Sequence, residues 1–483
     1  MTCCASAQIQ QAWVARYNNG SGNSTNQAVK IALDSAGNIY VTGFSQNGNS
    51  NLGYVTIKYA PSGNQLWASR YDSTNYPSAT PAALALDSSN DVFVTGSALT
   101  IKYDPNGNQI WTAPYSGTSL AADADGNSYV TGFSTSFDTI KLGAAGSNLW
   151  QTSYVDVGPT ISQVVLLDDS NNVYVAGSDT YYCFPGNCYA QLLIVKYDSN
   201  GNQLWTSTNN EDDASISTVH VQGAALDSVG NFNLLVDFGL YINFVTLKYN
   251  ASGSLLWTAF DPGPDTAADV PHGLVLDKLG NVIATGQSVY IAPSYAYATF
   301  QYGTYKAAAN GAWIWTNTFP TVPIQPSVAN AIAVDGANNS YVTGYSPGAN
   351  SSNDIATIKY DQNGNQIWLQ RYNGPGNGND AGNAIAVDNN GNVYVTGYET
   401  TAAGGTEIVT IKYSPLTLQR RADGTVLLEA QGSPGESFEI QASADLLYWL
   451  DLGSVVADTN GLMQFDDTNA PNYPARFYYT NPQ

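Results

Sequence analysis

The sequence predicts an all-β protein, with an eight-bladed β-propeller of four-stranded blades over residues 8–414 and a small β-sandwich over residues 415–483. Two repeated units predict the propeller. The first reads Ile-Ala-Val-Asp-x-x-Gly-Asn-Val-Tyr-Val-Thr-Gly, and the second reads Thr-Ile-Lys-Tyr, a turn, and Gly-Asn-Gln-Leu/Ile-Trp. The tryptophans that end the second unit recur on average about every 51 residues between Trp13 and Trp368, which is the scale of one four-stranded blade.

The first unit predicts the two strands a and b of each blade. Three residues after its aspartate stands only Gly or Asn, which predicts a tight turn with positive φ. Nine residues after it stands a glycine in every copy except the fifth, which has Val236. The eight aspartates are Asp34, Asp87, Asp123, Asp168, Asp227, Asp277, Asp335 and Asp388.

The second unit predicts strands c and d. A glycine four residues before each tryptophan from Trp67 to Trp368 predicts a tight c–d hairpin. A lysine stands nine residues before Trp67, Trp111, Trp150, Trp205, Trp257 and Trp368, and in repeat six we place Gln301 at the lysine position. We expect the repeated Asp, Lys and Trp to hold the blades together. The strand-d tryptophans are Trp13, Trp67, Trp111, Trp150, Trp205, Trp257, Trp315 and Trp368.

The two ends of the repeat array predict how the ring closes. The last copy stops after Lys412-Tyr413 without its tryptophan, whereas the chain begins with an orphan Trp13-Val-Ala-Arg16-Tyr17 that matches strand d elsewhere. We therefore expect the N-terminal strand to complete the eighth blade and remove a free sheet edge. A seven-bladed ring with one aberrant copy is the alternative, and the short second and third repeats are where the count of eight would fail.

The repeat pattern ends after Pro415. Short alternating runs such as Thr425-Val-Leu-Leu-Glu429, separated by turn signals such as Asp423-Gly424, predict a small β-sandwich. We expect Trp449 in its core. Modules of this kind act as spacers, adhesion units or sorting signals.

The two units together resemble the SBBP-type β-propeller repeats of secreted and cell-surface bacterial proteins, over about residues 8–414. The segment after them resembles the Ig-like or fibronectin-like C-terminal modules of secreted bacterial proteins. The resemblance implies a propeller outside the cytoplasm and no defined activity. The family name refers to seven blades, so the count of eight departs from it.

Composition excludes several functions. The chain has 483 residues, with 16 Lys and Arg against 38 Asp and Glu, so its net charge is −22. Nucleic acid is excluded as a partner, because binding it requires a basic surface. The 33 Tyr, 10 Trp and 14 Phe exclude a disordered acidic tail, and no apolar run is long enough to span a membrane. The acidic surface suits cationic or neutral polar partners.

The cysteines and the N-terminus favour an oxidising, extracellular compartment. Ala5-Ser6-Ala7 resembles a signal-peptidase cleavage site, so residues 1–7 are interpreted as a signal-peptide remnant or a disordered terminus. Cys183 and Cys188 enclose a turn-forming tetrapeptide, which predicts a local disulfide. A metal site at this cysteine pair is disfavoured, because no second Cys or His pair stands nearby.

We expect ligand binding where the symmetry breaks, on the face formed by the long and variable b–c and d–a loops. Tyrosines, histidines and carboxylates gather there in repeats four to six, and exposed tyrosines beside carboxylates suit a glycan or protein ligand. The candidate ligand-binding residues are Tyr181, Tyr182, Phe184, His220, His272, Tyr290 and Tyr295.

The favoured function is a secreted, non-catalytic binding or scaffold propeller without a cofactor. The alternative is a glycosidase or lyase on the loop face of repeats four to six, with Glu211 and Asp213 beside the two histidines as its acid–base candidates. A quinoprotein dehydrogenase is a weaker alternative, because the Asp–Gly–Trp spacing is one residue too short. A calcium site at Asp123–Asn127 is disfavoured, because the segment offers only two carboxylates.

Overall fold

The computed structural model describes residues 9–20, 23–132, 136–154, 160–184, 187–209, 218–239, 244–260, 269–291, 298–320, 326–349, 351–432, 435–445, 447–459 and 461–482. These residues are all-β apart from one short 3-10 turn, η1(Ala470–Asn472). No helix among them is long and apolar enough to cross a membrane.

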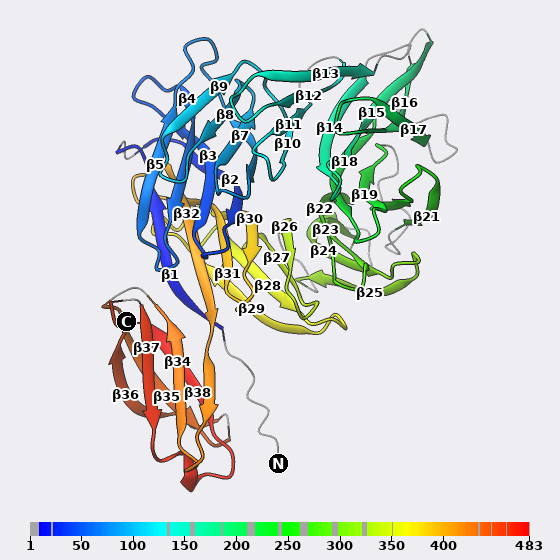
Figure 1. The fold of residues 1–483 in the computed structure, drawn as a ribbon. Coiled ribbons are helices and arrows are strands. Elements are labelled where there is room, and N and C mark those ends of the chain that lie inside the picture. The colour runs from blue at the N-terminus through cyan, green and yellow to red at the C-terminus, as the bar shows by residue number, and fades with distance from the viewer. Residues whose placement is uncertain are drawn as a thin grey trace.

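The described chain forms eight four-stranded antiparallel sheets around a ring, as expected for a propeller (Figure 1). We number the sheets as blades 1 to 8 in chain order. Blades 1 to 4 consist of β2(Asn26–Leu33), β3(Ile39–Gln46), β4(Leu52–Tyr59) and β5(Gln65–Tyr71); β6(Pro81–Leu86), β7(Val92–Gly96), β8(Thr100–Tyr103) and β9(Gln109–Ala113); β10(Ser119–Ala122), β11(Ser128–Thr131), β12(Phe137–Leu142) and β13(Asn148–Tyr154); and β14(Thr160–Leu167), β15(Val173–Phe184), β16(Asn187–Tyr197) and β17(Gln203–Asn209).

The second half of the ring repeats the same order. Blades 5 to 8 consist of β18(His220–Leu226), β19(Phe232–Asp237), β20(Val245–Tyr249) and β21(Leu255–Phe260); β22(Val270–Leu276), β23(Val282–Ile291), β24(Ala298–Ala307) and β25(Trp313–Phe319); β26(Val328–Val334), β27(Ser340–Pro347), β28(Asn353–Tyr360) and β29(Gln366–Tyr372); and β30(Ala381–Val387), β31(Val393–Thr400), β32(Thr406–Pro415) and β1(Ile9–Tyr17). The first strand of each blade, strand a, contacts strand a of the next blade all the way around, from β2 to β6 and finally from β30 back to β2.

The N-terminal strand closes the ring as the sequence predicts. β1 pairs antiparallel with β32, from Ile9 opposite Pro415 to Tyr17 opposite Ile408. Blade 8 therefore takes three strands from one end of the repeat array and its outer strand from the other end.

The turn residues adopt the backbone conformation predicted from the repeats. All eight Gly and Asn residues three positions after the repeat Asp have positive φ, between 57° at Asn171 and 80° at Gly230. The c–d turn glycines also have positive φ, as at Gly107 with 84°. These turns hold both hairpins of a blade tight on one face of the ring, which we call the turn face; the opposite face is the loop face.

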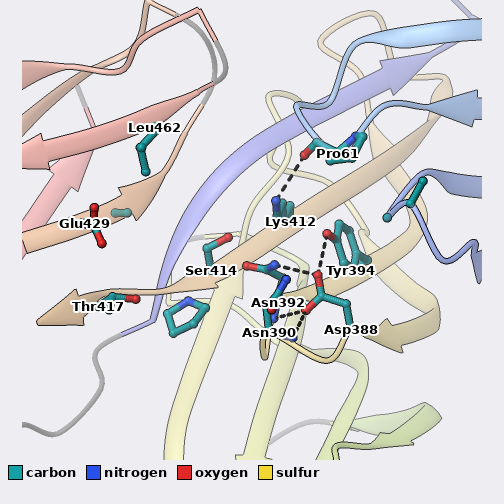
Figure 2. Close-up of a pocket in the computed structure, with 14 residues that line it drawn as sticks. Pro61, Asp388, Asn390, Asn392, Tyr394, Lys412, Ser414, Thr417, Glu429 and Leu462 are labelled. Carbon is teal, nitrogen blue, oxygen red and sulfur yellow. Dashed lines mark hydrogen bonds between the residues drawn. The ribbon is translucent and has the colours of Figure 1, made fainter. Parts of the chain in front are cut away.

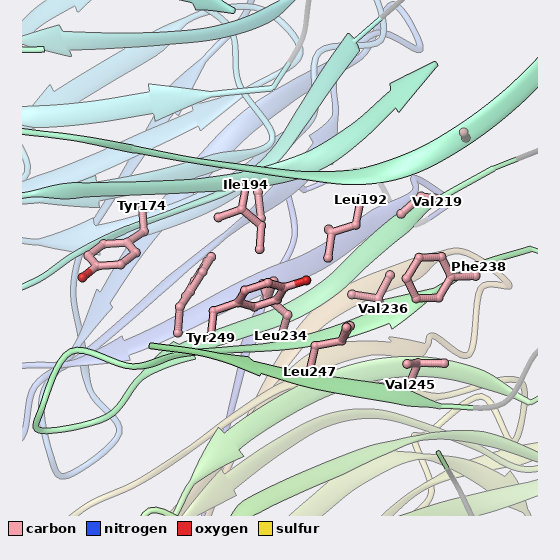
Figure 3. Close-up of a cluster of buried hydrophobic side chains, with 13 residues drawn as sticks. Tyr174, Leu192, Ile194, Val219, Leu234, Val236, Phe238, Val245, Leu247 and Tyr249 are labelled. Atoms are coloured by element: carbon pink, nitrogen blue, oxygen red, sulfur yellow. The ribbon is translucent and has the colours of Figure 1, made fainter. Parts of the chain in front are cut away.

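Buried side chains fill the spaces between neighbouring blades. Figure 3 shows the cluster between blades 4 and 5, where Ile194 faces Leu234 and Leu247. This cluster also explains the missing repeat glycine of blade 5, because Val236 takes that position and packs into the cluster. Elsewhere the glycine is required by a close approach, since a Cβ at Gly43 would lie 2.1 Å from the Gln27 carbonyl oxygen.

Residues 416–482, which we call the C-terminal module, form two three-stranded sheets beside the ring (Figure 1). One sheet has the order β33(Thr417–Arg420), β34(Val426–Gln431), β37(Leu462–Asp467), and the other has the order β36(Leu450–Val456), β35(Ser437–Ser443), β38(Phe477–Pro482). Leu428, Phe438, Ile440 and Tyr478 form part of their shared buried cluster. The expectation for Trp449 is wrong: its side chain is 39% exposed, because it precedes β36 and lies outside this cluster.

Candidate functional site

The repeat aspartates are occupied by the a–b turns. In blade 1, Oδ1 of Asp34 accepts the backbone N–H groups of Ala36 and Asn38 at 3.0 and 2.8 Å, and Oδ2 accepts the Asn38 amide at 2.7 Å. Burial raises the pKa of Asp34, but these hydrogen bonds outweigh it and lower the pKa below its usual value. Asp123, the calcium candidate, makes the same contacts to Asp125 and Asn127. Its oxygens are thus engaged by the turn.

The strand-c lysines face these aspartates within the same blade. The distance between Nζ and the carboxylate differs from blade to blade. It is 2.9 Å for Lys306 and Asp277, whereas it is 3.8 Å for Lys359 and Asp335, where the Tyr341 hydroxyl also donates to the carboxylate. The tyrosine supplies a hydrogen bond that replaces part of the ion pair.

The assignment of Gln301 to the lysine position is wrong. Lys306 stands opposite Trp315 in the β24–β25 register and pairs with Asp277. Gln301 lies five residues earlier, opposite Ser288. Lys306 also keeps the spacing of nine residues before its tryptophan that the other strand-c lysines show.

Tryptophan and lysine side chains connect most blades to the next one. In blade 1 the Trp67 indole N–H and the Lys58 ammonium both donate to the Pro105 carbonyl of blade 2, at 3.0 and 3.1 Å. Seven of the eight tryptophans make the equivalent bond to the c–d turn of the following blade. Trp13 and Trp111 are buried and the other six are half-buried. The repeated polar residues are therefore taken up by structural contacts.

Most of the loop-face candidates cannot be placed. The backbones of Tyr181, Tyr182, Phe184 and Tyr290 lie on β15 and β23, but their side chains are outside the described residues, as is the whole of Tyr295. Glu211 and Asp213 are also outside them.

The predicted disulfide stays a prediction. Cys183 stands opposite Cys188 in the register of β15 and β16. Their side chains are outside the described part of the chain, so only the pairing of the two backbones is known.

The two histidines make separate contacts. His220 is exposed at the start of β18, opposite Asp237 of its own blade. His272 is half-buried, and its Nδ1 lies 2.7 Å from the Ala329 carbonyl oxygen of blade 7. Burial lowers the pKa of His272, so its neutral form is favoured.

A concave site lies on the turn face, at the junction of blade 8, blade 1 and the C-terminal module (Figure 2). We call it the junction cavity. It has a volume of about 400 Å³, within the range of small-molecule sites, which also favour domain interfaces. Its lining residues are Ala36, Gly37, Pro61, Asp388, Asn390, Asn392, Tyr394, Lys412, Ser414, Pro415, Thr417, Glu429, Ala430 and Leu462.

The floor of the junction cavity is the blade-8 turn. Oδ1 of Asp388 accepts the backbone N–H groups of Asn390 and Asn392, both at 2.9 Å. Its Oδ2 accepts the Asn392 amide at 2.7 Å and the Tyr394 hydroxyl at 3.2 Å (Figure 2). The turn is therefore rigid, while the exposed Asn390 side chain lines the cavity.

The wall of the junction cavity comes from β32. The Lys412 ammonium donates to the Pro61 carbonyl of blade 1 at 3.2 Å, and burial lowers its pKa (Figure 2). Two residues on, Ser414 is 1% exposed, and its hydroxyl has no hydrogen-bond partner among the described residues. A buried hydroxyl without a partner costs free energy, which a ligand hydroxyl in the cavity would recover.

The opposite wall comes from the C-terminal module. Thr417 begins β33, and Glu429 of β34 accepts the Gln464 amide at 2.6 Å. With Asp388, Glu429 and Lys412 the cavity carries a formal charge of −1 and offers both hydrogen-bond donors and acceptors. Sequence reasoning placed function on the loop face and missed this site. The available signal was the end of the repeat at Pro415, where the chain enters the module instead of turning into strand d.

A buried carboxyl cluster also escaped sequence reasoning. Glu399 and Glu407 stand opposite each other on β31 and β32. Glu399 accepts Arg16 Nε at 2.5 Å and the Tyr372 hydroxyl, and Asn18 donates to Glu407 at 2.8 Å. Burial, supported by the bond to Glu407 and opposed by Tyr372 and Arg16, raises the pKa of Glu399 to about 7. The cluster ties the N-terminal strand to blades 7 and 8.

The described residues contain no group of three or more His, Cys, Asp or Glu side chains suited to holding a metal ion. The structure thus gives no independent support to a calcium site at Asp123.

The comparisons with known proteins agree with the repeats. The model of the SBBP β-propeller repeat matches residues 12–49 and 367–398. An uncharacterised WD repeat-containing protein, L264 of Acanthamoeba polyphaga mimivirus, is 23% identical over 451 residues, which cover 80% of this chain and 31% of the relative. The chain thus spans about a third of that relative's length.

Similar solved structures include two bacterial proteins and an enzyme. A protein of unknown function from Dyadobacter fermentans is 11% identical, with 84% of this chain and 99% of that chain covered and a TM-score of 0.40. A protein from Lactobacillus plantarum is 12% identical, with 72% and 96% covered and a TM-score of 0.42. A PL25 polysaccharide lyase, an ulvan lyase, is 10% identical, with 81% and 97% covered and a TM-score of 0.42.

Proposed function

We propose that the chain is a non-catalytic binding or scaffold protein of the cell surface or extracellular space, an eight-bladed β-propeller with a C-terminal β-sandwich. Its best-supported ligand site is the junction cavity. The observation that carries this proposal is Ser414, which lines a cavity of about 400 Å³ and whose buried hydroxyl has no partner among the described residues.

The lining selects a small, neutral, hydroxyl-rich ligand, such as a monosaccharide or a short glycan. Asp388 and Glu429 disfavour an anion, and Lys412 disfavours a cation at the same wall. A sugar hydroxyl both donates and accepts hydrogen bonds, which matches the mixture of carboxylates, amides, ammonium and hydroxyl. The rigid Asp388 turn would lower the cost of binding, because little has to be ordered.

The proposal is tested by saturation-transfer NMR on the full chain with glucose, galactose, mannose, maltose, cellobiose and lactose. We expect at least one saccharide to bind. Asn390→Leu should weaken its binding at least tenfold, because a bulkier apolar side chain replaces an amide that lines the cavity and can hydrogen-bond to a sugar.

Ser170→Leu is the matched control, since Ser170 occupies the same turn position in blade 4 and donates the same backbone N–H to its aspartate. It should leave binding unchanged. Absence of binding by all six saccharides, or equal losses in the two variants, would refute the site. Conversion of a bound saccharide into products would replace the non-catalytic assignment by the enzymatic alternative.

A glycan or protein ligand on the loop face remains a second proposal. Its support is the concentration of tyrosines in repeats four to six and the extended hairpin of β15 and β16, which carries three of the candidates. Tyr181→Ala, Tyr182→Ala and Phe184→Ala combined should abolish binding on a glycan array if this face is used. Unchanged array binding would exclude it.

The extracellular location is tested through Cys183 and Cys188. If the chain folds in an oxidising compartment, intact-mass analysis of protein isolated from its native source should show these cysteines bridged. Two free thiols at these positions would argue against this location.

A further inference from the structure

The C-terminal module has an exposed aromatic surface that the junction cavity does not use. Leu447 and Tyr448 are 78% and 81% exposed, and Leu450 is 56% exposed. A group of exposed large apolar side chains often marks a binding site, whereas a single exposed one does not. None of these residues lines the junction cavity.

The centre of this surface is an aromatic pair. The Trp449 ring lies 6.1 Å from the Tyr479 ring, at an interplanar angle of 66°. Trp449 is 39% exposed and Tyr479 is 38% exposed, so each ring contacts the other and still presents area to solvent. Such a pair is held in place by its own edge-to-face contact.

Polar side chains stand in register beside this pair. Gln441 of β35 is opposite Asp451 of β36 on one side and opposite Tyr479 of β38 on the other. The Gln441 amide also donates to Glu439 at 3.1 Å. One row across the sheet therefore combines a carboxylate, an amide and an aromatic ring.

Hydrogen bonds to Asp445 hold the backbone at Leu447 and Tyr448, just before Trp449. Oδ1 of Asp445 accepts the backbone N–H groups of Leu447 and Tyr448 at 2.9 and 3.0 Å. These bonds lower the pKa of Asp445 below its usual value, so its carboxylate is ionised at neutral pH. The backbone at Leu447 and Tyr448 is thus held to Asp445 before any ligand arrives.

We propose that the outer face of the β36–β35–β38 sheet binds a neutral polysaccharide. Trp449 and Tyr479 stack against the apolar face of a sugar ring, and Gln441 and Asp451 bind its hydroxyls. A sugar ring has apolar C–H faces and a polar edge, which matches aromatic rings beside an amide and a carboxylate.

The charge of the module sets the class of polysaccharide. Residues 416–483 contain three Arg and no Lys against nine Asp and Glu, a formal charge of −6. An anionic polysaccharide or an anionic membrane surface would be repelled. A neutral chain such as a glucan is the occupant that both the aromatic pair and the charge favour.

The test is affinity electrophoresis of the full chain in gels containing hydroxyethylcellulose, xyloglucan, laminarin or soluble starch, with alginate as the anionic comparison. We expect at least one neutral polysaccharide, but not alginate, to retard the protein. Trp449→Ala and Tyr479→Ala should each reduce the apparent affinity at least tenfold. Because both side chains lie outside the buried cluster of the module, the thermal midpoint should hardly change.

The matched control is Tyr473→Ala, an aromatic residue of the same module that is 36% exposed and packs on Arg476 instead of Trp449. It should not change the retardation. Retardation by none of the neutral polysaccharides, stronger retardation by alginate, or an equal loss with Tyr473→Ala would overturn the proposal. Asn390→Leu should leave this retardation intact, so failure of the junction cavity and failure of this surface are distinguishable.

Discussion

Gly107 of blade 2 packs so closely on Trp67 of blade 1 that a Cβ atom at position 107 would lie 2.5 Å from the indole ring. The same contact recurs between Gly63 and Trp13, where blade 8 meets blade 1, at 2.8 Å. The glycine of each c–d turn is therefore required twice, by its positive φ and by the indole of the preceding blade.

Gly107→Ala should separate these two requirements. We expect it to lower the free energy of unfolding by about 2 to 4 kcal/mol, from the strain of positive φ together with overpacking against Trp67. Gly404→Ala is the control, because Gly404 has a φ of 89° but nothing within 4 Å of its added Cβ. Gly404→Ala should lower the free energy of unfolding by about 1 kcal/mol, as measured by urea unfolding. Equal losses in the two variants would mean that the contact with Trp67 contributes nothing.

The charged pairs of blades 6 and 7 should differ in their contribution to stability. Lys306 and Asp277 are buried 2.9 Å apart, so Lys306→Met leaves a buried carboxylate without its cation and should cost about 2 to 4 kcal/mol. Lys359 is more exposed and 3.8 Å from Asp335, which keeps the Tyr341 hydroxyl. Lys359→Met should therefore cost about 1 kcal/mol or less. Denaturant unfolding of the two variants measures both losses of stability. A larger loss for Lys359→Met than for Lys306→Met would contradict this account.

The sequence was most informative where one backbone requirement recurs in every repeat. Only Gly or Asn satisfies the positive φ at positions such as Gly37 and Asn90, so the turns could be predicted from the residue type alone. Lys306 was missed although it stands nine residues before Trp315, the same spacing as the other strand-c lysines. The spacing between lysine and tryptophan across the c–d turn therefore stays constant even where strand β24 is ten residues long.

The candidate site depended on contacts that no repeat encodes. Ser414 is an ordinary serine in the sequence, and only the path of the chain into the C-terminal module places it at a cavity. Trp449 was assigned to the core from its residue type, yet the core space is filled by residues such as Phe438 and Tyr478. Which of several aromatic residues fills a small core is decided by packing between two sheets, which local sequence patterns do not specify.

Closure of the ring by the N-terminal strand predicts a sharp boundary in a truncation series. Removing residues 1–17 deletes β1 together with buried Trp13, whose indole N–H donates to the Pro61 carbonyl at 3.0 Å. We expect the thermal midpoint to fall by about 10 °C or more. Removing only residues 1–8 should leave it nearly unchanged, because β1 begins at Ile9. A similar midpoint for both truncations would refute the role of β1 in closure.

The Glu399 cluster makes the same closure sensitive to pH. The pKa of Glu399 is about 7 in the folded protein, above the ordinary value of 4.5, because its carboxyl is buried beside Glu407. Between these two values the folded state binds more protons than the unfolded state, so the free energy of unfolding falls as pH rises. The full effect, complete above pH 7, is about 3 kcal/mol.

Glu399→Gln should remove this pH dependence, because glutamine keeps a carbonyl oxygen that can accept from Arg16 and cannot ionise. Urea unfolding of both proteins from pH 4.5 to 8 gives the difference between their free energies of unfolding. His272 and Asp380 titrate in both proteins, so their contributions cancel in this difference. We expect that difference to shift in favour of the variant by about 3 kcal/mol across this range. A constant difference would show that the pKa of Glu399 is not raised in the folded protein, and that its pairing with Arg16 offsets burial.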